Sequence, residues 1–406
     1  MSAARLEGDR IVLPGLATVH SHAFQRAMRG HAQRAPLPGS FWSWREAMYR
    51  LADAIDPETL YDVSHFAFVE LALAGVTCVG EFHYVHHQKD GTPYADRTAL
   101  SDVVIRAALD AGLRITLLRV VYERAGFGRE LESAQRRFSD ASLELALADV
   151  ETLQSRWAEE PRVRVGLAPH SLRAVTRASF AACVRFADER GLPLHAHVSE
   201  VLREVRECLA EHGRRPVEVL ADLGALGPRF TAVHATHLSA AEVRTFGRSG
   251  SSACLCRTTE RDLGDGFPDV SGLVRAGARI VTGTDSHASS CPFEEARAIE
   301  LDERPRTNSR TVALDAERLL TAIAGDAYAA LGWARIDGDS VRLDANDPAL
   351  VGASEARPTD AVIFGAGPRA VREVVVAGRR IVEDGRHPAY EKARTAFAKA
   401  TRAVMG

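Results

Sequence analysis

Two histidines, His20 and His22, are separated by a single residue in the stretch IVLPGLATVHSHAFQR. They follow the apolar run Leu16 to Val19, which is typical of a short β-strand. Side chains alternate between the two faces of a strand, so the two imidazoles point the same way and could bind one metal ion. An isolated pair of this kind also arises by chance or as packed histidines, so the motif needs further ligands from elsewhere in the chain.

Those further ligands lie at the ends of later apolar segments. His197 lies within LPLHAHVSE and Asp285 within RIVTGTDSH. Nitrogen and carboxylate ligands suit a divalent ion, so the sequence predicts a site for one metal ion, with Zn²⁺ favoured and Fe²⁺ or Mn²⁺ as alternatives. The predicted metal ligands are His20, His22, His197 and Asp285.

A metal ion at this position would activate water, because it lowers the pKa of a bound water from about 15.7 toward about 7. The reaction then needs one side chain to take up the water proton and one to protonate the leaving group. Glu200 follows His197 after two residues, and His234 lies near the end of the next apolar segment. The predicted catalytic residues are therefore Glu200, His234 and Asp285, and the division of the proton transfers among them stays open.

Eight β-rich apolar segments alternate with stretches of helical period, a pattern that indicates a parallel sheet covered on both faces. Eight such units predict an α/β fold, a (β/α)8 TIM-like barrel of the metal-dependent hydrolase type. An open doubly wound sheet is the competing architecture, but no GxGxxG motif follows the first strand. The segments are Leu16–His22, Val76–Tyr84, Leu113–Tyr122, Val163–Ser171, Leu192–Glu200, Phe230–Leu238, Ala253–Glu260 and Arg279–His287.

Two regions fall outside the predicted barrel, which spans residues 13–340. Residues 1–12 and 341–387 are expected to form a small β-subdomain from both chain ends, and residues 388–406 a C-terminal helix. Within the subdomain, Gly-rich turns separate alternating segments that predict strands. These predicted strands are Ala361–Phe364, Val371–Val376 and Arg379–Val382, while Arg34–Ser40 and Gly126–Ser139 are expected to be loops and Leu301–Arg310 a polar connection.

Composition excludes several classes of protein. The 406 residues are 46% hydrophobic and 26% charged, with a formal net charge of −3, so no polyanion-binding surface is indicated. The sequence shows no apolar signal core and no run long enough to cross a bilayer. Its six cysteines are scattered without a disulfide-framework spacing, which favours the reducing cytoplasm.

Taken together, the motifs HSH, HAHVSE, VHATH and GTDSH resemble the amidohydrolase superfamily in their order along the chain. Many binuclear members carry a carboxylated lysine after the fourth strand. Here that strand ends in Ala168-Pro169-His170, and the missing lysine implies a mononuclear site, as in the deaminases of the superfamily.

A narrower resemblance is carried by HAFQR, FWSWRE, GEFHYVHH, CRTTERDLGDG and TDSHAS, which are similar to the formimidoylglutamate deiminase family of histidine degradation. That resemblance implies hydrolysis of N-formimidoyl-L-glutamate to N-formyl-L-glutamate and ammonia. It also implies a homodimer. Two departures stand out: the N-terminal segment is shorter than in the family, and Arg257 follows Cys256 where proline is expected.

The same resemblance implies the substrate contacts. A substrate with two carboxylates calls for fixed arginines, although most arginines in any chain are solvated surface charges. Arg45 is expected in the long loop after the first strand, and Gln25 is expected to contact the formimino group. The implied substrate-binding residues are Gln25, Arg45, Tyr84, His170 and Arg173.

Three other functions compete with this interpretation. A different amidohydrolase deaminase, acting on a purine, pterin or triazine-type ring, would share the metal ligands but would use an aromatic stacking pocket instead of convergent arginines. A catalytically dead barrel should have lost at least one catalytic or metal-binding residue, and none is missing. A deaminase acting on nucleic acid is disfavoured by the net acidity and by the lack of a basic stripe.

Overall fold

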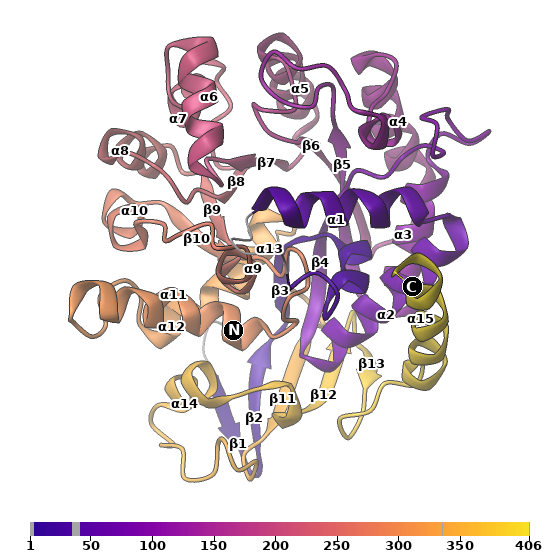
Figure 1. The fold of residues 1–406 in the computed structure, drawn as a ribbon. Helices are drawn as coiled ribbons and strands as arrows, with labels where there is room; N and C mark the ends of the chain where they lie inside the picture. Colours follow the sequence, from indigo (N-terminus) through magenta and orange to yellow (C-terminus); the bar gives the residue numbers. More distant parts are fainter. Residues whose placement is uncertain (1–3, 35–40, 335, 406) are drawn as a thin grey trace.

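Eight parallel strands form the central sheet of the chain, in the order in which they occur in the sequence (Figure 1). The computed structural model describes residues 4–34, 41–334 and 336–405. Neighbouring strands pair in parallel throughout. The strands are β3 (Leu16–Ser21), β4 (Val76–His83), β5 (Arg114–Val121), β6 (Val163–Pro169), β7 (Leu194–Val198), β8 (Phe230–His234), β9 (Ser252–Leu255) and β10 (Arg279–Thr282).

Two backbone hydrogen bonds join the first strand to the segment after the last one. The N–H of His22 donates to the carbonyl of Asp285, and the N–H of Asp285 donates to the carbonyl of His20, both at 3.0 Å. They bring the ends of the sheet together, so the eight strands form a nearly closed (β/α)8 barrel, as the alternation of segments predicts. The closure also brings the HSH motif, which contains His20 and His22, into contact with the GTDSH motif, which contains Asp285.

Helices surround the strands in Figure 1, and each of them contains buried apolar side chains. In α2 (Pro57–Leu73), the side chain of Asp56 accepts from the N–H of Thr59 and Pro57 begins the helix, which fixes its start. The strands themselves are buried on both faces, and every residue of β4 and β5 is buried. The other outer helices are α3 (Ala99–Asp110), α4 (Leu143–Arg156), α5 (Arg177–Arg190), α6 (Leu202–His212), α7 (Pro216–Asp222), α8 (Ala240–Arg248), α10 (Val270–Ala276), α11 (Pro292–Thr307) and α12 (Ala316–Ala322).

Helix α1 (Phe41–Ala54) lies in front of the barrel strands in Figure 1. The expectation that Arg45 lies in a loop is therefore wrong. Phe41, Met48, Leu51 and Ala52 are buried, and this spacing is that of one helix face. Of the predicted loop Arg34–Ser40, residues 35–40 lie outside the described residues.

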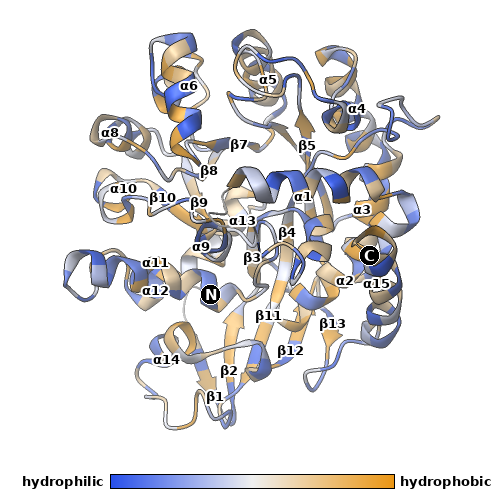
Figure 2. Ribbon diagram, viewed as in Figure 1, coloured by the Kyte–Doolittle hydropathy of each residue, from blue (hydrophilic) through white to orange (hydrophobic). Residues whose placement is uncertain are grey.

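A second, antiparallel sheet is built from both ends of the chain, as predicted. Its strand order is β1-β2-β11-β12-β13. Figure 2 shows mainly hydrophobic colours in β2, whereas hydrophilic residues interrupt β11 and alternate with hydrophobic ones in the outer helices. The strands are β1 (Arg5–Glu7), β2 (Arg10–Pro14), β11 (Ser340–Asp344), β12 (Val371–Val376) and β13 (Arg379–Val382).

One predicted strand of this sheet is wrong. Ala361–Phe364 lies in helix α14 (Pro358–Gly365), whose buried residues are Thr359, Val362 and Ile363. These residues follow the i, i+3, i+4 spacing of a helix, and Pro358 fits the first helical turn. The strand that takes its place, β11, is absent from the sequence-based prediction.

Three smaller expectations also change. The predicted polar connection Leu301–Arg310 is helical up to Thr307, because α11 continues through Pro305. The seventh strand ends at Leu255, and helix α9 (Arg257–Leu263) takes up the rest of its predicted range. The predicted loop at 126–139 contains a short 3₁₀ helix, η2 (Ser133–Phe138).

Four further elements complete the described part of the chain, namely η1 (Ala23–Met28), α13 (Gly325–Ala330), η3 (Pro368–Ala370) and the terminal helix α15 (Tyr390–Met405). Among the described helices, none combines the length and the apolar character needed to cross a membrane.

Candidate active site

Three imidazoles and one carboxylate converge at the C-terminal ends of the barrel strands. His20 and His22 come from β3 and His197 from β7, and one ring nitrogen of each lies within 4.8 Å of the other two. Asp285 follows β10, and its Oδ1 is 3.5 Å from Nε2 of both His20 and His22. The structure therefore brings together the four residues that the sequence assigns to the metal.

The hydrogen bonds of these histidines fit a metal site. Nδ1 of His22 lies 2.9 Å from the carbonyl of Phe82, and Nδ1 of His197 lies 3.0 Å from the carbonyl of His170. A carbonyl can only accept, so each Nδ1 carries the proton and each Nε2 presents its lone pair to the centre of the cluster.

The charge states fit as well. Burial lowers the pKa of His22 to about 3 and also lowers the pKa of His20 and His197, so the rings are neutral. Burial would raise the pKa of Asp285, but its hydrogen bond with His20 and the neighbouring His234 hold it below its usual value. Three neutral imidazoles and a carboxylate are a donor set for a divalent ion.

His234 lies beside this cluster at the end of β8. Its Nε2 is 3.5 Å from Oε1 of Glu200 and 3.7 Å from Oδ2 of Asp285, and its Nδ1 is 3.2 Å from Oε1 of Glu260. Burial opposes a charge on His234, but these carboxylates outweigh it and raise its pKa well above the ordinary value. Burial also raises the pKa of Glu200. The group can therefore hold a proton and pass it on.

Two of these residues have left-handed backbones, with φ of +71° at His234 and +55° at Asp285. Residues other than glycine rarely adopt this conformation, and it costs on the order of 1–3 kcal/mol at each position. The strand ends thus carry strain at the two positions that turn a side chain toward the metal cluster.

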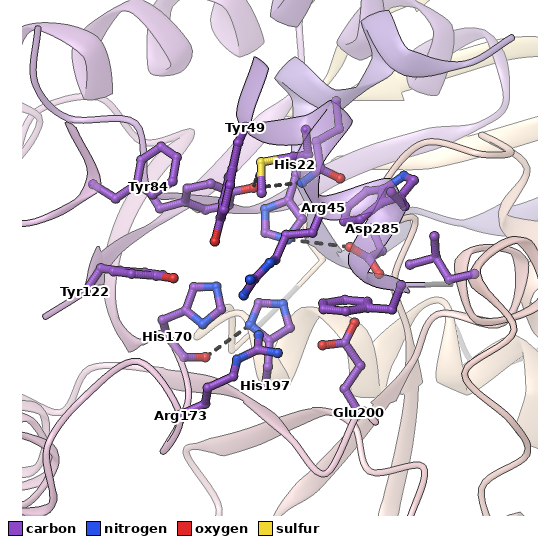
Figure 3. Close-up of a pocket in the computed structure, with 16 residues that line it drawn as sticks. His22, Arg45, Tyr49, Tyr84, Tyr122, His170, Arg173, His197, Glu200 and Asp285 are labelled. Atoms are coloured by element: carbon purple, nitrogen blue, oxygen red, sulfur yellow. Dashed lines mark hydrogen bonds and ion pairs between the residues drawn. The ribbon is translucent and has the colours of Figure 1, made fainter. Parts of the chain in front are cut away.

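A pocket with about 520 Å³ of empty space opens beside the cluster (Figure 3). All five residues that the sequence assigns to substrate binding line it, together with His22, His197, Glu200 and Asp285. His20 and His234 are not among the lining residues. The five are Gln25, Arg45, Tyr84, His170 and Arg173.

The two arginines reach into this pocket from opposite sides in Figure 3. Arg173 is 4% exposed, and its Nη1 has no hydrogen-bond partner among the described residues. Its guanidinium lies 5.5 Å from the ring centre of Phe41, and that of Arg45 lies 4.5 Å from the ring centre of Trp42. These cations contact aromatic faces, so their N–H groups remain available to an anion.

The carboxyl groups near Arg173 offset its charge incompletely. Burial opposes the charge on Arg173, but Glu204 and Glu200 raise its pKa. Burial in turn raises the pKa of Glu204 to about 7 and raises that of Glu200, which favours their neutral forms. The pocket therefore keeps positive charge for a ligand.

Gln25 and Tyr84 form a polar wall on another side. Nε2 of Gln25 donates to the hydroxyl of Tyr84 at 2.8 Å, while Oε1 of Gln25 is buried without a partner among the described residues. A free amide oxygen suits an N–H group of a ligand. His170 lies close by, with Nδ1 3.1 Å from the hydroxyl of Ser171.

The sequence-based analysis misses two polar residues that line the pocket, Tyr49 and Tyr122. Tyr122 directly follows β5, so the rule that active-site residues follow barrel strands could have found it. Tyr49 lies one helical turn after Arg45, a relation that is visible only once residues 41–54 are recognised as a helix.

Residues 11–380 match the amidohydrolase family. The chain therefore belongs to this family of metal-dependent hydrolases. It is 42% identical to the formimidoylglutamate deiminase of Pseudomonas aeruginosa over 411 aligned residues, which cover 97% of this chain and 89% of that protein.

Solved structures show the same relationship. An amidohydrolase from Brucella melitensis superposes with a TM-score of 0.91 at 34% identity, over 99% of this chain and 96% of that one. An adenosine deaminase from Xanthomonas campestris with bound zinc superposes with a TM-score of 0.82 at 25% identity, over 97% of this chain and 85% of that one.

Proposed function

We propose that this chain hydrolyses N-formimidoyl-L-glutamate to N-formyl-L-glutamate and ammonia, a step of histidine degradation. The single observation that carries the proposal is Arg173, a buried cation with a free N–H group in the pocket beside the metal cluster. A buried cation calls for an anionic ligand, and a substrate with two carboxylates supplies it. The similarity to the Pseudomonas deiminase supports the same substrate.

We further propose that His20, His22, His197 and Asp285 hold one Zn²⁺. The donor set suits this ion, and the similar adenosine deaminase has bound zinc. When bound, the ion supplies positive charge that lowers the pKa of water and stabilises negative charge on oxygen.

The protein residues divide the remaining work. Arg45 and Arg173 bind the carboxylates of the substrate, and Tyr84 and His170 add polar contacts. Gln25 contacts the formimino group through its free amide oxygen. This fixes the substrate before the reaction, and ordering of this kind lowers the barrier. An analogue without the carboxylates would leave the buried guanidinium groups unpaired and would be rejected.

The proton transfers follow from the positions of Asp285, His234 and Glu200. Asp285 accepts one water proton as the oxygen attacks the formimino carbon and the electron pair of the C=N bond moves to the nitrogen, while His234 hydrogen-bonds to the added oxygen and keeps its proton. Glu200 delivers a proton to the nitrogen that leaves. Glu200 then takes up the remaining hydroxyl proton as the C=O bond closes and the C–N bond breaks, and the proton on Asp285 passes to the leaving nitrogen. Ammonia therefore leaves with two protons gained, and Asp285 and Glu200 return to their starting states.

The test is ammonia release by zinc-loaded protein from N-formimidoyl-L-glutamate, with guanine and adenosine as ring amines. We expect turnover of the formimino acid alone. Arg173→Met should lower kcat/KM at least about thirtyfold with zinc content unchanged, because a buried charge pair is worth about 2–5 kcal/mol.

The matched control is Arg177→Met, at an exposed arginine of α5 that pairs with Asp222 at 3.5 Å. It should leave kcat/KM unchanged. Turnover of a ring amine without turnover of the formimino acid would reject the proposal in favour of a ring deaminase.

A further inference from the structure

Two tyrosine hydroxyls, those of Tyr49 and Tyr122, lie beside the arginines of the pocket. Tyr49 comes from α1 and Tyr122 directly follows β5, and both line the pocket. Figure 3 shows both phenol oxygens directed into it. None of the roles in the proposed reaction uses them.

Gln135, on η2, holds the two hydroxyls. Its Nε2 lies 2.7 Å from the hydroxyl of Tyr49 and 2.9 Å from that of Tyr122. Its Oε1 lies 2.9 Å from the backbone nitrogen of Glu132. The backbone N–H can only donate, so the amide oxygen must face it and the NH₂ group must face the tyrosines. Gln135 is completely buried, which fixes this orientation.

The orientation of Gln135 decides what the tyrosines can offer. Both phenol oxygens accept a hydrogen bond from the amide, so their own O–H groups are left to donate elsewhere. The two hydroxyls also interact with each other, which engages one proton between them. At least one O–H therefore remains for a ligand. Burial raises the pKa of Tyr122, so it stays protonated and remains a donor.

The hydroxyl group that remains free to donate lies in the electrostatic field of both arginines. The charges of Arg173 and Arg45 act on Tyr122, and Tyr49 acts on Arg173. Two guanidinium groups and a hydroxyl donor thus face the same pocket. A carboxylate has about four lone-pair sites, so it can accept from both kinds of donor at once.

We infer that Tyr49 and Tyr122, held by Gln135, complete the subsite that binds one carboxylate of the substrate and make it selective for a carboxylate over an amide. This inference rests on the proposed function. An amide in the same position would turn its NH₂ donors toward the N–H and O–H groups of this wall. Donors that face donors leave buried groups unpaired, and a site of this kind rejects the wrong ligand strongly.

The experiment measures kcat and KM of the zinc-loaded enzyme for N-formimidoyl-L-glutamate and for its two monoamides, in which either carboxylate is replaced by an amide. In Tyr122→Phe we expect kcat/KM for the diacid to fall about ten- to a hundredfold, mainly through KM, the loss expected for a hydrogen bond to a charged group. For the monoamide that lacks the recognised carboxylate, the change should stay within about threefold.

Two more variants keep the test independent of one substitution. Tyr49→Phe and Gln135→Met should reduce the preference for the diacid over that monoamide in the same direction. Tyr61→Phe is the matched control. Tyr61 lies on α2, its hydroxyl donates to Asp110 of α3 at 2.7 Å, and neither residue lines the pocket. It should leave the preference unchanged.

The outcomes separate this inference from the proposed function. If the parent enzyme turns over the diacid but all three pocket variants keep its preference, or lose activity equally on all three substrates, the inference is wrong and the proposed function stands. If the parent enzyme does not turn over the diacid, both are wrong.

Discussion

A chain of buried charges runs from His234 to the protein surface. Glu260 lies 3.2 Å from Nδ1 of His234 and pairs with Arg257 on the other side. Arg257 is 1% exposed and also pairs with Asp302 at 2.8 Å. Arg257, which stands where the family resemblance leads one to expect proline, thus supplies a cation to Glu260 that proline could not supply. The pair fixes the carboxylate that orients the imidazole.

At the scale of single residues, we predict that Glu260→Gln lowers kcat about tenfold or more, while KM changes little. The carboxylate orients His234 and stabilises its charge, but it is not among the residues that line the pocket. A neutral amide keeps the shape and loses the charge-assisted bond, which is about twice as strong as a neutral one. Steady-state kinetics on zinc-loaded protein check this, and zinc content serves as the control. An unchanged kcat would show that His234 needs no such partner.

Close contacts between helices set limits at the scale of elements. Helices α8 and α10 pack at Gly247, where an added Cβ would lie 2.4 Å from Cβ of Ala276 and 2.6 Å from its carbonyl oxygen. The backbone of Ala276 cannot move aside by a change of rotamer, so the two helices would have to separate.

We therefore predict that Gly247→Ala lowers the free energy of unfolding. Overpacking costs about 1–3 kcal/mol, which exceeds the roughly 1 kcal/mol gained in helix propensity. The midpoint of urea unfolding measures the difference. Gly325→Ala is the control, since Gly325 begins α13 and nothing lies within 4 Å of the added Cβ. A stabilised Gly247→Ala would show that the helix pair yields easily.

For the whole molecule, buried carboxyl groups couple stability to pH. Burial raises the pKa of Glu295 from 4.5 to about 8, although it accepts from the backbone N–H of Thr258 at 3.2 Å. Between these values the folded state keeps a proton that the unfolded state has lost. Stability therefore falls as the pH rises through this range, by about 1.4 kcal/mol for each unit of pKa difference at most.

We predict that Glu295→Gln gains stability relative to the parent as the pH rises from 5 to 8, because the amide does not ionise. Urea unfolding across this range measures the gain. In Glu70, burial would raise the pKa, but Arg26 and Arg29 lower it to about 2. The stability that Glu70 contributes is therefore lost only as the pH falls below about 4.5, so Glu70→Gln should show a constant difference from pH 5 to 8. A constant difference in Glu295→Gln would contradict the prediction.

The homodimer implied by the family resemblance also belongs to the scale of the whole molecule, and it stays a prediction.

The barrel itself was predictable, since alternation of apolar strands and helices is a local pattern that the chain repeats eight times. The subdomain was less predictable. Ala361–Phe364 fits both a strand and a helix over four residues, and only its neighbours in the fold select the helix α14.

By itself, the sequence determined the strands of the barrel, the spacing of His20 and His22, and the positions of His197, His234 and Asp285 at strand ends, because each depends on residues close together in the chain. Only the tertiary structure decided that helix α1 brings Arg45 and Tyr49 over the pocket and that Gln135 joins Tyr49 to Tyr122. These groups come from three separate segments. Their distances are set when the barrel closes, and no spacing along the chain records them.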